Sequence, residues 1–262
     1  MKTLSVGSVG LLGLCLAPAV HAQLPTLPDN PNGSNGVPGR ARNDPSAGIR
    51  TSVEGGGATV HREPRVIANG PLAPASEDRD AWREFLHDKH SGLIRLMPRE
   101  KYDRSISHAP QRIKMRGGGA YYSFALLTHE YGYGSDIELD KNTLSVGFAG
   151  TDYGVLQNLG DVPLADITLK DQRTFILAHY QVPRSERYAR SAYMQLGEGV
   201  VINGETFARR LPMVVDNPYL LRSIIFPGTD VLVAFRVIRR DADGSATILW
   251  KLLKQSSNRP NN

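Results

Sequence analysis

Residues 230–254, DVLVAFRVIRRDADGSATILWKLLK, decide the fold class of this 262-residue chain. Valine and phenylalanine recur at every second position along 231–237, and the positions between them are mostly apolar. The run 241–244, Asp-Ala-Asp-Gly, has the composition of a tight turn with a glycine free to adopt positive φ. Residues 245–254 return as a second apolar run that includes Trp250. Apolar side chains on both faces predict a β-hairpin covered on both sides.

Three more segments have the pattern of strands. Residues 136–150 carry alternating apolar side chains on either side of a turn at 140–142, which predicts a second hairpin. Residues 120–127 and 219–226 are rich in aromatic and branched apolar side chains and are predicted as further strands. We therefore expect one mainly β domain, a single antiparallel β-sandwich or barrel-like fold with one N-terminal helix and few others.

The N-terminal helix is predicted to begin at Ser76, a good N-cap that two acidic residues follow in the first turn. Apolar side chains then recur at helical spacing, at Ala81, Trp82, Phe85 and Leu86. Gly92 is expected to end this helix. Residues 171–188 are predicted to hold a short helix within a long connection.

Composition divides the chain into four segments. Residues 1–22 have the features of a signal peptide. Residues 23–75 are rich in Pro, Gly and Asn, and their few apolar side chains cannot offset the entropy of ordering the backbone. We predict a disordered spacer at 23–75, a globular mainly-β domain at 76–255 and a flexible tail at 256–262.

The signal-peptide prediction depends on three adjacent features. Lys2 supplies a positive charge, and residues 4–16 form an apolar run that is too short to span a bilayer. Val-His-Ala at 20–22 has the side chains that a signal peptidase reads, so we expect cleavage before Gln23. The mature chain is then exported, periplasmic or secreted, with no transmembrane segment. Cys15 leaves with the signal, so the mature protein would have neither disulfides nor thiolate chemistry.

Basic residues exceed acidic ones in this chain. It has 31 Lys and Arg against 26 Asp and Glu, a formal net charge of +5. The arginines occur as pairs and singles along the sequence and form no basic stripe. We therefore predict no nucleic-acid partner, while attraction to anionic surface polymers stays open.

The candidate site lies at residues 128–136, Thr-His-Glu-Tyr-Gly-Tyr-Gly-Ser-Asp. An imidazole and two carboxylates meet there in a glycine-rich loop, so His129, Glu130 and Asp136 are candidate catalytic residues. The candidate ligand-binding residues are Tyr121, Tyr131, Tyr133 and Arg116. We expect no metal, because a metalloprotease motif needs a second histidine where Tyr133 stands. We also expect no cofactor.

The glycines of this loop let the chain reverse direction sharply. A strand that ends at Leu127 and one that begins near Asp136 are therefore expected to lie side by side. His129 and Glu130 would then lie at the rim of a concave site, with Asp136 across the loop. A packing role is the alternative, because tyrosine is enriched in strands.

Three functions are open at this point. The first hypothesis is an exported binding or surface module for a glycan, since arginines pair with acidic groups and tyrosines offer flat faces. The second is an extracellular polysaccharide hydrolase or lyase that uses His129 and Glu130 as its acid/base couple. The third is a structural cell-envelope protein whose β domain packs on an envelope component.

Overall fold

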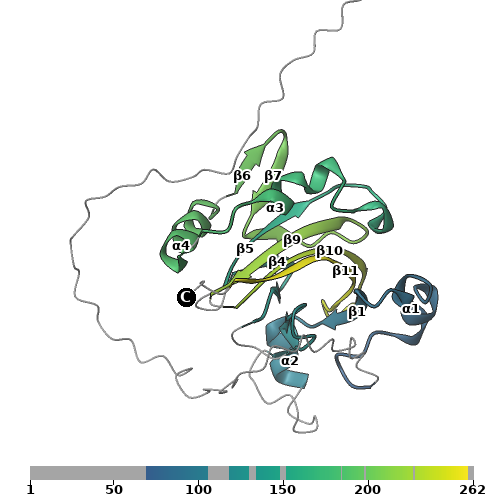
Figure 1. The fold of residues 1–262 in the computed structure, drawn as a ribbon. Coiled ribbons are helices and arrows are strands. Elements are labelled where there is room, and N and C mark those ends of the chain that lie inside the picture. Colours follow the sequence, from purple (N-terminus) through teal and green to yellow (C-terminus); the bar gives the residue numbers. More distant parts are fainter. Residues whose placement is uncertain are drawn as a thin grey trace, which may run out of the picture.

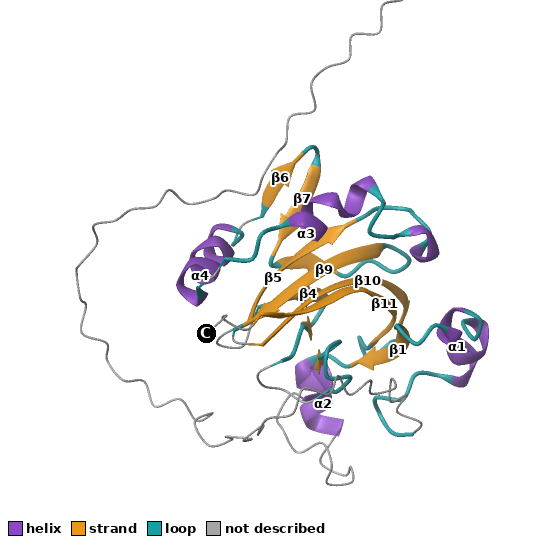
Figure 2. Cartoon of the chain, in the orientation of Figure 1, coloured by secondary structure: helices purple, strands orange, loops and turns teal. Residues whose placement is uncertain are grey.

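The computed structural model describes residues 69–105, 118–129, 134–147, 152–183, 185–197, 199–226 and 228–258. These residues form two antiparallel β-sheets with short helices around them (Figures 1 and 2). The predicted signal peptide at 1–22 lies outside the described residues, as does the predicted spacer up to residue 68. None of the helices in the described part is long and apolar enough to cross a membrane.

The larger sheet has seven strands in the order β1-β11-β10-β9-β5-β7-β6. They are β1 (Ser91–Leu96), β5 (Asp152–Asn158), β6 (Val200–Ile202), β7 (Glu205–Ala208), β9 (Pro218–Ile225), β10 (Gly228–Arg240) and β11 (Ala246–Asn258). The smaller sheet has four strands in the order β2-β3-β4-β8, which are β2 (Tyr121–Tyr122), β3 (Ile137–Asp140), β4 (Thr143–Ser145) and β8 (Arg210–Pro212). The mainly antiparallel β fold predicted from the sequence is confirmed.

The helices are short. The predicted first helix is interrupted, because α1 (Ser76–Ala81) ends before Trp82 and a separate 3₁₀ turn follows at Phe85–His87. Other α-helices in the described ranges are α2 (Arg99–Ser105), α3 (Phe175–His179) and α4 (Glu186–Gln195). Further 3₁₀ turns occur at Gly118–Ala120, Leu164–Asp166 and Gln172–Thr174. The short helix predicted within 171–188 corresponds to α3, and α4 begins before that range ends.

The C-terminal hairpin predicted from the sequence is confirmed. β10 pairs with β11, Phe235 lies opposite Trp250, and Gly244 in the turn has a φ of +87°. Trp250 is 2% exposed, and its indole packs against the ring of Phe124 at 5.3 Å between centroids. A Cβ at Gly92 would lie 2.6 Å from the indole, so glycine at this position of β1 makes room for Trp250.

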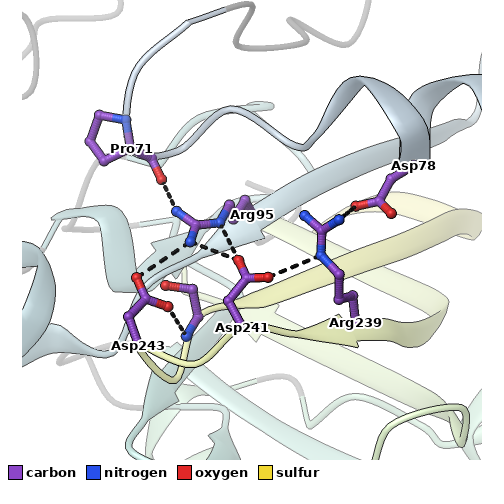
Figure 3. Close-up of polar contacts among 7 residues, drawn as sticks. Pro71, Asp78, Arg95, Arg239, Asp241 and Asp243 are labelled. Carbon is purple, nitrogen blue, oxygen red and sulfur yellow. Dashed lines mark hydrogen bonds and ion pairs between the residues drawn. The ribbon is translucent and has the colours of Figure 1, made fainter.

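Ion pairs join the turn of this hairpin to the N-terminal part of the domain (Figure 3). The guanidinium of Arg95 on β1 donates to Asp241 from Nε and Nη2, at 3.0 and 2.8 Å. Arg239 lies between Asp241 and Asp78 of α1, 3.0 Å from a carboxylate oxygen of each. The acidic turn therefore helps to hold β1 and α1 against the hairpin.

One apolar core lies between the two sheets. Side chains from both sheets meet in it, including Phe235 and Trp250 of the larger sheet and Ile137 and Leu144 of the smaller one. The other face of the larger sheet packs against α3 and the chain before it, in a second core. Two sheets that share a core form a β-sandwich, and both faces of the larger sheet are covered as its apolar pattern predicts.

The strand predicted over 120–127 is wrong beyond β2. The carboxylate of Asp136 accepts the N–H groups of Phe124, at 2.7 Å, and of Ala125, at 3.4 Å. A longer strand would need these donors for its ladder, so the chain turns instead, with Leu127 at a φ of 56°. The rest of the expected pairing is present, because β2 lies beside β3.

The other predicted strands are confirmed. β3 and β4 form the hairpin expected within 136–150, with Leu139 opposite Leu144. The strand expected at 219–226 is β9, which lies between β10 and β5 and is buried along its whole length. β9 is therefore the middle strand of the larger sheet.

The folded part of the chain extends slightly beyond 76–255 at both ends. Leu72 is 1% exposed and lies in a small apolar cluster, so packing begins before residue 76. At the other end β11 runs to Asn258, into the segment 256–262 that was expected to be a flexible tail.

Candidate functional site

His129, the imidazole of the predicted cluster, is buried. The residue is 7% exposed, and its ring packs edge-on against Tyr122 at 4.9 Å between centroids. Its Nε2 lies 3.1 Å from the backbone oxygen of Arg95, to which it donates a hydrogen bond. Burial lowers the pKa of His129 to about 4, so the ring is neutral at pH 7. This placement differs from the rim of a concave site that the loop sequence predicted.

Tyr121 is buried as well. Its hydroxyl donates to Glu138 at 2.8 Å, and Ser145 donates to the same carboxylate at 2.8 Å. The ring therefore packs inside the domain and offers no exposed face to a ligand. Four other candidates lie outside the described residues, and their roles stay predictions: Arg116, Glu130, Tyr131 and Tyr133.

Asp136 is buried directly before β3, where it fixes the turn that follows β2. Its Oδ2 accepts hydrogen bonds from the N–H of Phe124 at 2.7 Å and from the hydroxyl of Ser123 at 3.3 Å. Its Oδ1 is buried and has no hydrogen-bond partner in the described part of the chain. Burial raises the pKa of Asp136 to about 6, although the Ser223 hydroxyl and two backbone N–H groups lower it in part.

Asp152, which the sequence prediction missed, is the first residue of β5. It is 2% exposed, and within the described ranges neither carboxyl oxygen has a hydrogen-bond partner. Burial and then the negative charge of Asp136 raise the pKa of Asp152 to about 8, although the N–H of Gly134 lowers it in part. The two carboxyl groups therefore lie near each other, and we call Asp136 and Asp152 the carboxyl pair.

The carboxyl pair lies between the two sheets. Along β5, Asp152 is on the same face as Leu156, which belongs to the core that the sheets share. Ser223 of β9 lies opposite Gly154 of β5 and so faces the same layer. Asp136 enters this layer from the smaller sheet. A polar group here is remote from water, which explains why both carboxyl groups hold their protons to higher pH than usual.

A third buried aspartate shows how this fold neutralises a carboxylate. Asp230 of β10 is 6% exposed and accepts two hydrogen bonds from the guanidinium of Arg222, at 2.9 and 2.8 Å. In the part of the chain that the structure describes, neither Asp136 nor Asp152 forms an ion pair. Buried carboxyl groups without partners destabilise a fold and are frequent at functional sites.

A short sequence motif marks all three buried aspartates. Each is the last residue of a Gly-Ser/Thr-Asp tripeptide, at 134–136, 150–152 and 228–230. Each tripeptide stands at the start of a strand: directly before β3, ending on the first residue of β5, and as the first three residues of β10. Comparing these three tripeptides would have drawn attention to Asp152.

The carboxyl pair can accept hydrogen bonds and exchange a proton near neutral pH. Three of its four oxygens lack partners among the described residues. With one pKa of about 6 and one of about 8, the pair holds about one proton at pH 7. Hydroxyl or ammonium groups of a ligand have the donors that these oxygens need.

Two other features of the described residues do not form a comparable site. They contain no group of three or more His, Cys, Asp or Glu side chains that could hold a metal ion. A cavity of about 20 Å³ beneath α4, bordered by Tyr153, Tyr180 and Tyr193, has room for about one water molecule. The carboxyl pair is therefore the best candidate site.

Comparisons with protein-family models, with curated proteins and with solved structures found no match to this chain. A functional proposal therefore has to rest on the chemistry of the carboxyl pair and of the groups around it. The carboxyl oxygens of the pair are hydrogen-bond acceptors that the fold holds in place, away from water.

Proposed function

We propose that the protein is an exported carbohydrate-binding module in which binding opens the layer between the sheets at the carboxyl pair, so that Asp136 and Asp152 accept hydrogen bonds from sugar hydroxyl groups. One observation carries this proposal: Asp136 and Asp152 lie buried together with three oxygens that have no partner in the described residues. The signal-peptide features of residues 1–22 support export.

Carbohydrate suits this site for two reasons. A hydrogen bond from a hydroxyl group to an ionised carboxylate is about twice as strong as one between neutral groups, so a sugar compensates the buried charge. The sequence that leads to Asp136 also contains Tyr131 and Tyr133 between glycines, and tyrosine combines a flat apolar ring with a polar hydroxyl. Both features favour a polyhydroxylated ligand over a purely apolar one.

A polysaccharide hydrolase is the second candidate, and the pKa values of the carboxyl pair favour it. General acid/base catalysis at a glycosidic bond needs one protonated and one ionised carboxyl group. Values of about 6 for Asp136 and about 8 for Asp152 give this combination near pH 7. His129 is less suitable as an acid or base, because it is neutral, buried and bonded to the backbone.

The test is a glycan array probed with the mature chain, followed by calorimetry on each glycan that binds. Asp136→Asn and Asp152→Asn keep the shape of the side chain but replace one acceptor oxygen by a donor. We expect each variant to bind at least about tenfold more weakly, which corresponds to about 1.4 kcal/mol. Asp161→Asn is the matched control, because Asp161 is exposed on the loop after β5 and should bind normally.

The outcomes separate the candidate functions. Binding without cleavage, reduced in both pair variants, supports a binding module. Cleavage that Asp152→Asn abolishes while it still binds the glycan would replace the binding module by the hydrolase. Absence of any bound glycan would contradict the proposal and favour a structural role in the cell envelope.

A further inference from the structure

Helix α4 lies on the outside of the domain, on the opposite side from α1 (Figures 1 and 2). It packs against β5 and buries Ala189. Arg187, Arg190 and Met194 are three and four positions apart, so they lie along one side of the helix. All three are exposed, and Met194 is 62% exposed. We call these three residues the outer face of α4.

Two more arginines extend the positive charge beyond the C-terminal end of α4. The guanidinium of Arg209 lies over the ring of Tyr193, with 4.7 Å between Cζ and the ring centroid. A Cβ at Gly197 would lie 2.9 Å from Nη2 of Arg209 and 3.2 Å from the backbone oxygen of Met194, so this guanidinium lies beside the last turn of the helix. Arg210, the next residue along the chain, is exposed.

These arginines outnumber the acidic side chains that bind them. Glu186 forms an ion pair with Arg190 at 2.7 Å, and the side chain of Arg190 remains 59% exposed. Among the residues that the structure describes, no ion pair involves Arg187, Arg209 or Arg210. The sequence spaces the four arginines over residues 187–210, and the fold brings them to one surface. Its net positive charge complements an anionic partner.

We infer that the outer face of α4 docks on a membrane surface that contains anionic phospholipids. The guanidinium groups would bind lipid phosphates, for which their paired N–H donors are well suited. The side chain of Met194 would enter the layer of headgroups, as apolar side chains of interfacial helices do. An acidic polysaccharide would match the arginines equally well, but it offers no apolar layer to an exposed methionine. This inference goes beyond the proposed function and does not depend on the carboxyl pair.

The experiment is co-sedimentation of the mature chain with two kinds of vesicle. One kind is made of phosphatidylcholine alone, and in the other phosphatidylglycerol replaces part of it. Wild-type protein should sediment with the anionic vesicles at low salt and remain in the supernatant with the neutral ones. Added salt should weaken the binding, because it screens the arginines from the lipid phosphates.

Variants of the outer face separate its two contributions. Arg187→Gln should weaken binding about fivefold, the effect of one basic side chain near an anionic membrane. Met194→Asn should also weaken it about fivefold, because a partly buried apolar side chain is lost from the headgroup layer. Arg83→Gln and Leu169→Asn are the matched controls and should bind normally. Arg83 is exposed next to α1, and Leu169 is 44% exposed on the connection from β5 to α3.

Three results would overturn the inference. The first is wild-type protein that does not sediment with anionic vesicles. The second is binding that the control variants weaken as much as Arg187→Gln, or that Met194→Asn leaves unaltered, since either would show a general attraction of charge. The third is binding to heparin, a sulfated polysaccharide, without binding to vesicles, which would identify an acidic polymer as the partner. None of these results bears on glycan binding at the carboxyl pair, so the two proposals fail separately.

Discussion

Replacing Asp152 by asparagine should remove a loss of stability that wild-type protein shows as the pH rises. The pKa of Asp152 in the folded protein is about 8, above its ordinary value of 3.8. The unfolded chain therefore releases this proton at a lower pH than the folded one does. The contribution of Asp152 to the stability of the folded state is therefore fully present below pH 3.8 and is lost as the pH rises to about 8. Asparagine carries no titrating proton, so Asp152→Asn should lack this contribution.

The magnitude is best worked out above pH 6.5, where His129 does not interfere. The pKa of His129 is lowered from 6.5 to about 4, so its contribution increases with pH below 6.5 and is constant above it. Between pH 6.5 and 8 the linkage of Asp152 amounts to about 1.36 kcal/mol per pH unit. We therefore expect wild-type protein to lose roughly 2 kcal/mol of unfolding free energy over this interval.

Urea denaturation of the mature chain at a series of pH values measures this loss directly. Wild type and the control Asp161→Asn should lose stability together between pH 6.5 and 8. Asp152→Asn should have a nearly flat profile and be the more stable protein at pH 8, although the proposed function expects it to bind glycan more weakly. A wild-type profile that is flat, or that Asp152→Asn leaves unaltered, would refute the burial and coupling of the carboxyl pair.

Three further predictions concern the fold and the processing of the chain. Trp250→Ala should cost about 3–5 kcal/mol, because the indole is 2% exposed between the sheets. An unchanged melting temperature would contradict this. Arg222→Met should cost about 3–5 kcal/mol, because it leaves Asp230 charged and buried. Adding Asp230→Leu should recover most of the loss, and failure to do so would count against the buried ion pair. Protein recovered from an envelope fraction should begin at Gln23, as N-terminal sequencing would show, and retention of Met1 would disprove signal cleavage.

The strands could be predicted wherever the apolar pattern of the sequence matches the side chains that the fold buries. The apolar alternation around Trp250 and the Asp-Ala-Asp-Gly turn specify one hairpin, and the same signals specify β3 and β4. The predicted strand at 120–127 fails because a side chain from elsewhere, Asp136, takes the N–H groups of Phe124 and Ala125. Competition of this kind depends on tertiary structure and leaves no trace in the local sequence.

The candidate site was predicted only in part, for a related reason. Asp136 was identified because it stands in a loop with other polar groups, whereas Asp152 follows the hairpin that the sequence predicts at 136–150. The pairing of β5 with β9 brings Asp152 into the layer that Asp136 enters from the smaller sheet. His129 is predicted to be catalytic because its imidazole stands with two carboxylates in a glycine-rich loop. Its actual surroundings are the ring of Tyr122, close by in the sequence, and the backbone of Arg95, which lies 34 residues away in β1.

The most direct test of the carboxyl pair as a binding site is an NMR titration of the side-chain carboxyl carbons of Asp136 and Asp152, with and without saturating glycan. Both groups should titrate well above 4 in the free protein, near 6 and 8. Both pKa values should fall when glycan binds, because ligand hydroxyl groups stabilise the ionised carboxylates. Ordinary titration near pH 4 in the free protein, or pKa values that bound glycan leaves unchanged, would contradict the proposed site.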